Sequence, residues 1–289
     1  EKEADRIGIK ILHKAGFDVR GSTDFFKTLQ KGNRYTVGAA PSFLRTHPIT
    51  SERISDIEDR LTEYPYKQRA DDPSFHFVKG KIRVFLQDKK ATKKQLEINV
   101  KNKSYISELG ERYALAYAYL RNENFNKAQS ELEWIKSTKL ENPMIDKLNI
   151  EILLKKGDIN SAYLTIKKAL TRYPNYRVFV YELANYYIET KSIKEAIKLL
   201  QSYVLVFKTD PELYKLLAKA YSLNGKQLLQ YESLAEAFYY KYNLGEAIVQ
   251  MDMAVRARDG NFYEKSRVEA RLKQLQREKE IYEISKANL

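Results

Sequence analysis

Apolar residues recur at helical spacing along most of the chain, in segments separated by short polar turns. The pattern repeats every 34 residues, because Ala128, Ala162 and Ala196 each follow a polar turn and precede an amphipathic helix. Three further series keep the same phase: Ala116, Ile150, Ala184 and Ala218; Tyr119, Leu153, Tyr187 and Tyr221; and Leu132, Ile166, Leu200 and Leu234. Small residues at fixed places let two helices approach closely, and larger ones fill the space between helix pairs. The sequence therefore predicts a stack of helical hairpins.

The period of 34 residues matches that of tetratricopeptide repeats, which stack into an α-solenoid. The turns agree with this reading, since Gly stands at helix ends in "KKGDIN" and "SLNGKQ", and Pro174 and Pro211 separate hairpins. One unit is expected over residues 109–142, with the next two ending near residues 176 and 210.

The regular phase slips towards the carboxyl terminus, because Ala247 follows Ala196 by 51 residues, one period and a half. A single helix over residues 226–242 is therefore expected to close one hairpin and open the next. A strongly charged segment over residues 262–284 predicts a solvated helix that caps the stack. At the other end, residues 73–102 are expected to form one degenerate hairpin.

The first helix of each predicted hairpin supplies aromatic and cationic side chains to the face on which such solenoids bind proteins. The candidates for partner binding are Tyr113, Tyr117, Arg121, Lys147, Lys155, Tyr181, Asn185, Lys215 and Lys219. Tyr with cationic neighbours is typical of recognition surfaces, since Tyr brings a large contact area at low entropic cost. The alternative is that many of the 22 Tyr residues pack between hairpins. The expected partner is an extended or helical protein segment.

Charge and composition narrow the classes of function. The net charge of +13 would suit nucleic acid, but Lys is interleaved with Glu and Asp along the helices, and no motif that reads nucleic acid accompanies it. We therefore expect protein partners and no nucleic acid. The absence of Cys excludes disulfides and thiolate metal sites. No apolar run approaches the roughly 20 residues that cross a bilayer, so no transmembrane segment is predicted.

The amino-terminal segment carries a different pattern. Glu1 and Asp5 fall one turn apart on one stripe of a predicted helix, together with small and apolar residues. One interpretation is a simple helix start, because acidic residues favour a first turn. The second segment, "SFLRTHPITSERISDIEDR", places a His-Pro turn before a helix that Thr50 or Ser51 can cap.

Together, "EKEADRIG" at residues 1–8 and "FLRTHPITSERI" at residues 43–54 resemble the carboxyl-terminal part of the zinc metallopeptidase domain of the HtpX and BepA clan. BepA-like members also carry carboxyl-terminal tetratricopeptide repeats, so the resemblance covers the whole chain. It predicts an all-α chain, in which residues 1–70 are the carboxyl-terminal helices of a zincin-like metallopeptidase domain. Residues 71–289 would form a tetratricopeptide-repeat α-solenoid with a carboxyl-terminal capping helix.

The resemblance implies a function for the parent protein. It would be a bacterial periplasmic zinc endopeptidase and chaperone that acts in outer-membrane protein assembly and quality control. Its repeats would recruit protein or peptide clients, or the outer-membrane assembly machinery.

The resemblance also implies roles for single residues. In the family, a helix with His-Glu-x-x-His supplies two zinc ligands and the general base, and the first Glu of Glu-x-x-Ala-Asp supplies the third ligand. By this resemblance Glu1 would bind zinc, with Asp5 orienting the site. His47 would lie close to the cleft, where it could contact the metal or the substrate, or cap a helix. Arg53 could pair with a carboxylate near the site.

The chain departs from the family in its histidines. His13, His47 and His76 are its only His residues, and none stands in a His-Glu-x-x-His arrangement. We therefore expect that the chain alone holds no catalytic zinc and is not active, and that the missing helix precedes residue 1 in a longer parent. The alternative is a non-catalytic tetratricopeptide-repeat adaptor, in which the peptidase remnant only supports the solenoid.

Overall fold

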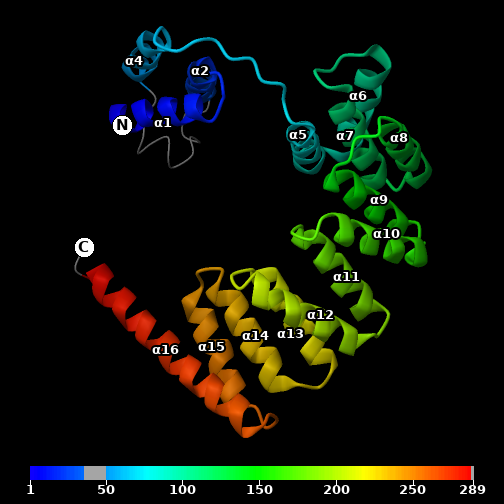
Figure 1. Ribbon diagram of the computed structural model, residues 1–289, viewed down its shortest axis with the longest axis vertical. Coiled ribbons are helices and arrows are strands. Elements are labelled where there is room, and N and C mark those ends of the chain that lie inside the picture. Colours follow the sequence, from blue (N-terminus) through cyan, green and yellow to red (C-terminus); the bar gives the residue numbers. More distant parts are fainter. Residues whose placement is uncertain (36–49, 288–289) are drawn as a thin grey trace. The chain divides into compact units, whose positions relative to one another are not determined.

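The computed structural model describes residues 1–35 and 50–287, and every regular element in those two ranges is an α-helix (Figure 1). This confirms the predicted all-α fold class. Contacts between helices divide the chain into two compact units, Glu1–Asp72 and Pro73–Leu289, a division that falls two residues after the expected boundary. None of the described helices combines the length and the apolar character that a membrane span requires.

The first unit contains three described helices: α1 (Lys2–Lys14), α2 (Arg20–Tyr35) and α4 (Ser51–Leu61). Its small core consists of Ile9, Val19 and Ile57, which are almost fully buried. Leu12 and Phe26 pack against this core from α1 and α2. The helices are amphipathic, so their apolar stripes meet while the charged residues stay at the surface.

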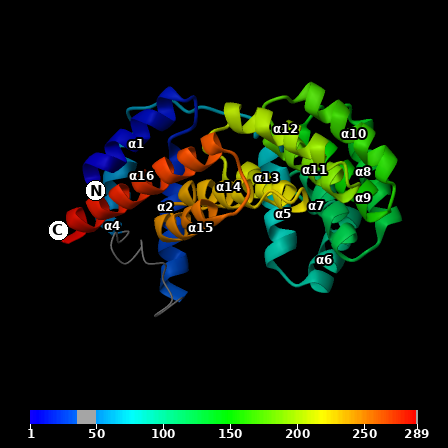
Figure 2. The same ribbon diagram turned by 90° about the horizontal axis from the view of Figure 1, so that it is seen from below.

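The second unit is a series of antiparallel helices that follow one another in chain order (Figures 1 and 2). They are α5 (Pro73–Leu86), α6 (Lys89–Asn102), α7 (Glu108–Arg121), α8 (Phe125–Ser137), α9 (Pro143–Lys155), α10 (Ile159–Arg172), α11 (Arg177–Glu189), α12 (Ile193–Val206), α13 (Pro211–Leu223), α14 (Gln227–Tyr239), α15 (Leu244–Arg256) and α16 (Phe262–Ala287). Most helices pack against their neighbours in sequence, which is the contact pattern of a solenoid.

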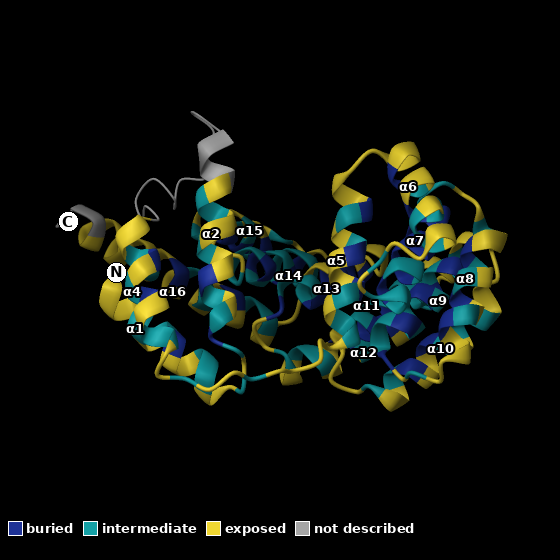
Figure 3. Cartoon of the chain, turned by 90° about the horizontal axis from the view of Figure 1, so that it is seen from above, coloured by how far each residue is buried: buried dark blue, intermediate teal, exposed yellow. Residues whose placement is uncertain are grey.

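The positions of the 34-residue repeat form the core of this unit. Ala128, Ala162 and Ala196 are completely buried in the second helices of their hairpins, where their small side chains permit close helix packing. Gly157 and Gly225 follow the ends of α9 and α13 with φ of +78° and +69°, a conformation that favours Gly. Figure 3 shows buried residues concentrated where the hairpins meet and exposed residues at the turns.

The carboxyl-terminal helices agree with the predicted change of phase. Helix α14 packs against both α13 and α15, as a helix shared by two hairpins would. Helix α16 lies along α15 and buries Val268 and Leu275 (Figures 1 and 2). Two Arg residues of α16 also form ion pairs with Glu residues of α14 at 2.7 Å: Arg267 with Glu232, and Arg271 with Glu236.

At the start of the second unit, α5 crosses α7 at very short range. A Cβ atom on Gly110 would lie 2.5 Å from the Cβ of His76, and a Cβ on Gly80 would lie 2.9 Å from the Cβ of Ala114. These two Gly residues permit a contact that no larger side chain allows without a shift. Helix α5 therefore covers the face of α7 that contains Tyr113.

Candidate functional site

Glu1 at the start of α1, Asp5 within α1 and Arg53 of α4 form a charged cluster in the first unit. Arg53 donates from Nε and Nη2 to the two carboxylate oxygens of Asp5, both at 2.8 Å, and from Nη1 to Oε2 of Glu1 at 2.9 Å. The hydrogen bonds to Asp5 raise the pKa of Arg53. The side chains of Arg53, Asp5 and Glu1 are 12, 9 and 35% exposed. The structure thus brings together three of the four residues that the resemblance assigned to a peptidase site.

Local structure places each member of this cluster. Glu1 and Asp5 are one helical turn apart, and the backbone N–H of Asp5 donates to the carbonyl oxygen of Glu1 at 2.9 Å. Thr50 caps α4 by accepting from the backbone N–H of Arg53 at 3.2 Å, which sets the start of that helix. The guanidinium carbon of Arg53 lies 5.1 Å from the ring centre of Phe26 on α2. All three described helices of this unit therefore contribute to the position of Arg53.

The described residues do not by themselves form a zinc site. Over residues 1–35 and 50–287, no group of three His, Cys, Asp or Glu side chains is arranged to hold a metal ion. Both carboxylate oxygens of Asp5 accept hydrogen bonds from Arg53. Glu1 is the more exposed carboxylate of the cluster. His47 lies outside the described residues. Among the described residues of this cluster, Glu1 is therefore the one candidate zinc ligand.

A largely apolar cavity of about 610 Å³ lies beside the cluster, between α1 and α2. Asp5, Leu12 and Phe26 are among its lining residues, and so are Phe17 and Phe25, which are about half exposed. A cavity of this size and character can accept an apolar side chain next to a carboxylate.

In the second unit, the prediction that Tyr113 and Tyr117 present their rings to a partner is wrong. Each residue is only 1% exposed. Tyr113 stacks on Phe77 of α5 with ring centres 4.3 Å apart, and the Tyr117 hydroxyl accepts from Nζ of Lys81 at 3.1 Å. The close crossing of α5 over α7 is the physical reason, because α5 occupies the face that the repeat pattern leaves open.

Arg121 and Lys147 are also tied to neighbouring helices. Arg121 donates from Nη1 to the carbonyl oxygens of Val84 and of Gln87 at the end of α5, so it satisfies acceptors that a helix end leaves open. Lys147 pairs with Glu182 at 2.7 Å and with Glu151 at 2.9 Å. Burial opposes the charge on Lys147, but the two Glu residues outweigh it and raise its pKa. Neither cation is a free group for a partner.

Tyr181 and Asn185 on α11 are half-buried. The Tyr181 hydroxyl donates to Oδ2 of Asp210, which also accepts from Nη1 of Arg177 at 2.7 Å. Burial, together with this hydrogen bond, raises the pKa of Tyr181. The polar group of Tyr181 therefore binds within the chain.

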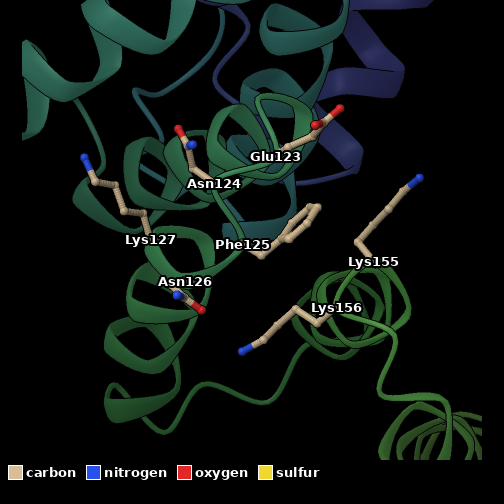
Figure 4. A pocket seen from close by; sticks show the side chains of 7 residues that line it. All are labelled: Glu123, Asn124, Phe125, Asn126, Lys127, Lys155 and Lys156. Carbon is tan, nitrogen blue, oxygen red and sulfur yellow. The ribbon is translucent and has the colours of Figure 1, made fainter.

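Three of the predicted cations are exposed. Lys215 and Lys219 lie one turn apart on α13. Nζ of Lys215 lies 3.4 Å from Oε2 of Glu212. Lys155, at the end of α9, lines a cavity of about 570 Å³ together with Lys156 and Phe125 (Figure 4). These side chains remain candidates for partner binding.

Two features of the second unit were not singled out from the sequence. Asp210 is 3% exposed and joins α11 to the start of α13, whereas the sequence pattern at this point indicated only that the next residue, Pro211, separates two hairpins. The lining of a cavity of about 920 Å³ includes four Tyr residues from the end of α14, the turn to α15, and α16: Tyr239, Tyr240, Tyr242 and Tyr282. The cluster "FYYKYN" at residues 238–243 was the available signal for it.

Comparison with known proteins gives two family matches. Residues 1–61 match Peptidase family M48, and residues 153–220 match the Tetratricopeptide repeat family. The first match spans the helices that carry Glu1, Asp5 and Arg53. The second spans α10 to α12 and most of α13.

Named relatives extend over almost the whole chain. The beta-barrel assembly-enhancing protease of Yersinia pestis is 27% identical over 279 residues, which are 96% of this chain and 57% of that protein. The protease of the same name from Escherichia coli K12 is 24% identical over 98% of this chain and 58% of its own length. This chain is a homologue of these proteases. The resemblance to BepA-like peptidases with tetratricopeptide repeats is therefore confirmed.

This chain spans somewhat less than three fifths of the length of these curated relatives. Among solved structures, MamA from Desulfovibrio magneticus RS-1 aligns with a TM-score of 0.41 and 19% identity, over 59% of this chain and 96% of that chain. Yeast Tom70 aligns with a TM-score of 0.44 and 14% identity, over 96% of this chain and 59% of that chain. Structural similarity at this level carries no conclusion about function.

Proposed function

We propose that this chain corresponds to the carboxyl-terminal part of a zinc-dependent endopeptidase of β-barrel assembly, in which the repeats recruit protein clients or assembly machinery. The observation that carries this proposal is the match of residues 1–61 to Peptidase family M48, in one chain with tetratricopeptide repeats. The names of the relatives give the class of activity and its setting in β-barrel assembly. A periplasmic location and a chaperone role in quality control belong to the same proposal.

In this proposal Glu1 is one zinc ligand, and the remaining ligands come from parts of the whole protein outside the described residues. Zinc of this kind supplies a Lewis acid and a bound water of lowered pKa. Arg53 and Asp5 act as positioning residues, because their hydrogen bonds fix the carboxylate of Glu1 at the start of α1. Partners of this type around a metal ligand hold its orientation.

The metal assignment is tested on the whole protein by zinc content and by cleavage of an unfolded β-barrel precursor. Glu1→Gln is expected to lose most of the zinc, and Asp5→Asn to weaken zinc affinity by about 10- to 100-fold. Glu3→Gln is the matched control, because Glu3 lies on the same helix turn and pairs with Arg6 instead. Unchanged zinc content in Glu1→Gln would remove Glu1 as a ligand. A whole protein without zinc or proteolytic activity would favour the adaptor.

The role of the repeats is tested at Lys215 and Lys219, which are exposed one turn apart on the first helix of their hairpin. Replacing both by Glu is expected to weaken binding of the β-barrel precursor in a pull-down or an anisotropy titration. The control is the equivalent double replacement at Lys194 and Lys198, an exposed pair one turn apart on α12. Equal loss in both double variants would show a general charge effect and would contradict a specific role for α13.

A further inference from the structure

Helix α5 is apolar on two sides. Phe77, Gly80 and Val84 are buried on the side that faces α7. The other exposed side, here called the outer face, consists of Phe75, Val78, Lys79, Ile82, Phe85 and Leu86. Phe85 lies at its edge, where its ring also meets Tyr117 of α7 edge-on with ring centres 6.1 Å apart. The five hydrophobic residues of the outer face are between 45 and 81% exposed. An exposed run of apolar side chains on a helix that already buries another apolar side is unusual for a solvated surface, so the outer face has the composition of a contact surface.

The middle of α16, the helix at the opposite end of the stack, has a different composition from the outer face of α5. The exposed positions in the middle of α16 include Arg267, Glu269, Lys273 and Lys279, and the apolar residues Val268 and Leu275 face α15. A solenoid needs a polar surface on its terminal helix to stay soluble. Helix α16 meets this requirement in its middle turns, whereas α5 presents to its outer side a surface of the kind on which another helix packs.

The surroundings of the outer face are strongly basic. Residues 73–104 contain nine Lys and Arg residues and two acidic residues, and α5 itself contains no acidic residue. Lys79 lies within the face, with Nζ 5.9 Å from the ring centre of Phe75, and Lys89 and Lys90 follow it in sequence. None of these three Lys residues forms an ion pair with a described residue. An acidic partner would therefore meet unpaired cations around an apolar stripe.

We propose that the outer face of α5 binds an acidic amphipathic helix of a partner protein. Its anchors Phe75, Val78, Ile82 and Phe85 are spaced by three, four and three residues, over about 15 Å. This spacing is that of the apolar seam between two packed helices, and helix recognition commonly uses such anchors. Acidic residues beside the partner's seam would pair with Lys79 and with the Lys residues that begin α6. The inference does not depend on the peptidase assignment.

The test uses the chain of residues 1–289 and a fluorescent synthetic helical peptide of about 14 residues, with Leu at the same spacing and Glu on both flanks. Fluorescence anisotropy is expected to show binding of this peptide. Binding of the same peptide with Lys flanks should be weaker by at least about 10-fold. The double variant Val78→Glu, Ile82→Glu should lower affinity for the acidic peptide by at least about 30-fold.

Leu164→Glu on α10 is the matched control, because Leu164 is a similarly exposed apolar residue away from α5, and this variant should bind normally. Lys79→Glu gives a second reading that leaves the apolar stripe intact, and about a 5-fold loss is expected. Absence of peptide binding, or equal binding of the acidic and basic peptides, overturns the proposal. A dimer in sedimentation that the double variant abolishes assigns the face to a second copy. Binding to vesicles of anionic lipid, lost in the double variant and without peptide binding, assigns it to a membrane surface.

Discussion

Arg53 on α4 and Asp5 on α1 are 48 positions apart in sequence and are joined by two hydrogen bonds, both 2.8 Å long. A two-point contact between a guanidinium and a carboxylate fixes orientation as well as distance. The same guanidinium reaches Glu1 at 2.9 Å, so the start of α1 depends on a residue of α4. The proposed ligand position is thereby part of the tertiary structure of the first unit.

Arg53→Met is expected to destabilise the packing of α1 against α4 by about 2 to 3 kcal/mol, because it leaves the nearly buried Asp5 carboxylate without its counter-charge. Hydrogen exchange of the α1 amides in the whole chain measures this loss of protection. Arg60→Met is the control, since Arg60 and Asp56 form a more exposed pair within one helix and their loss should matter much less. Equal effects of the two substitutions would contradict a special role for Arg53.

Gly110→Ala is expected to lower the free energy of unfolding by about 1 to 3 kcal/mol, the usual cost of overpacking. The added methyl group would lie 2.5 Å from the Cβ of His76, so α5 must move away from α7. Urea unfolding followed by the fluorescence of Trp134, the chain's only Trp, reports on these hairpins. Gly245→Ala, where no such clash exists, should leave the midpoint unchanged or slightly higher.

Burial raises the pKa of Tyr117 well above its ordinary value of about 10. The folded chain therefore keeps this phenol neutral while the unfolded chain ionises it. The stability it contributes is complete below pH 10 and is lost as the pH rises further. We expect Tyr117→Phe to reduce the alkaline slope of the unfolding free energy by about 1.4 kcal/mol per pH unit. Denaturant titrations from about pH 9 to 11.5 give this slope. Tyr242→Phe, at a fully exposed residue, should not change it.

Asp210 combines a helix cap with a link between hairpins. Its Oδ1 accepts from the backbone N–H of Glu212 at 2.9 Å, and its Oδ2 accepts from Arg177 and from the Tyr181 hydroxyl. Asp210→Ala is expected to cost about 3 kcal/mol, because the cap is lost and a partly buried hydroxyl loses its acceptor. Asp210→Asn keeps an acceptor for the cap and should lose distinctly less. Equal loss in the two variants, measured by thermal or urea unfolding, would show that the cap contributes nothing, and an Asp210→Asn variant as stable as the original chain would show the same of the link.

Much of the second unit could be predicted because its contacts are local. Repeated Ala residues such as Ala128 and Ala162 mark where two helices of one hairpin touch, and a period of 34 residues carries that contact from one hairpin to the next. The change of phase after Ala196 was readable for the same reason. When helices pack against their neighbours in sequence, the spacing of small and apolar residues predicts the contacts between them.

The partner-binding residues were less predictable. Tyr113 and Tyr117 have the repeat position of groove residues, yet both are buried. Arg121 has the charge and the repeat position expected of a partner-binding residue, yet it donates to carbonyl oxygens at the end of α5. In each case the deciding contact comes from α5, whose approach depends on two Gly residues and departs from the regular spacing of the repeat.

The sequence by itself determined the helical class, the hairpin order and the resemblance of the segments around Glu1 and Arg53 to a metallopeptidase, because these depend on local periodicity and short motifs. Only the tertiary structure decided that Arg53 binds Asp5 and Glu1, that α5 seals the face of α7, and that its outer face stays apolar and exposed. The physical reason is that burial and pairing depend on which distant surfaces meet. Which distant surfaces pack together depends on all contacts of the fold at once, so it cannot be predicted from a short stretch of sequence.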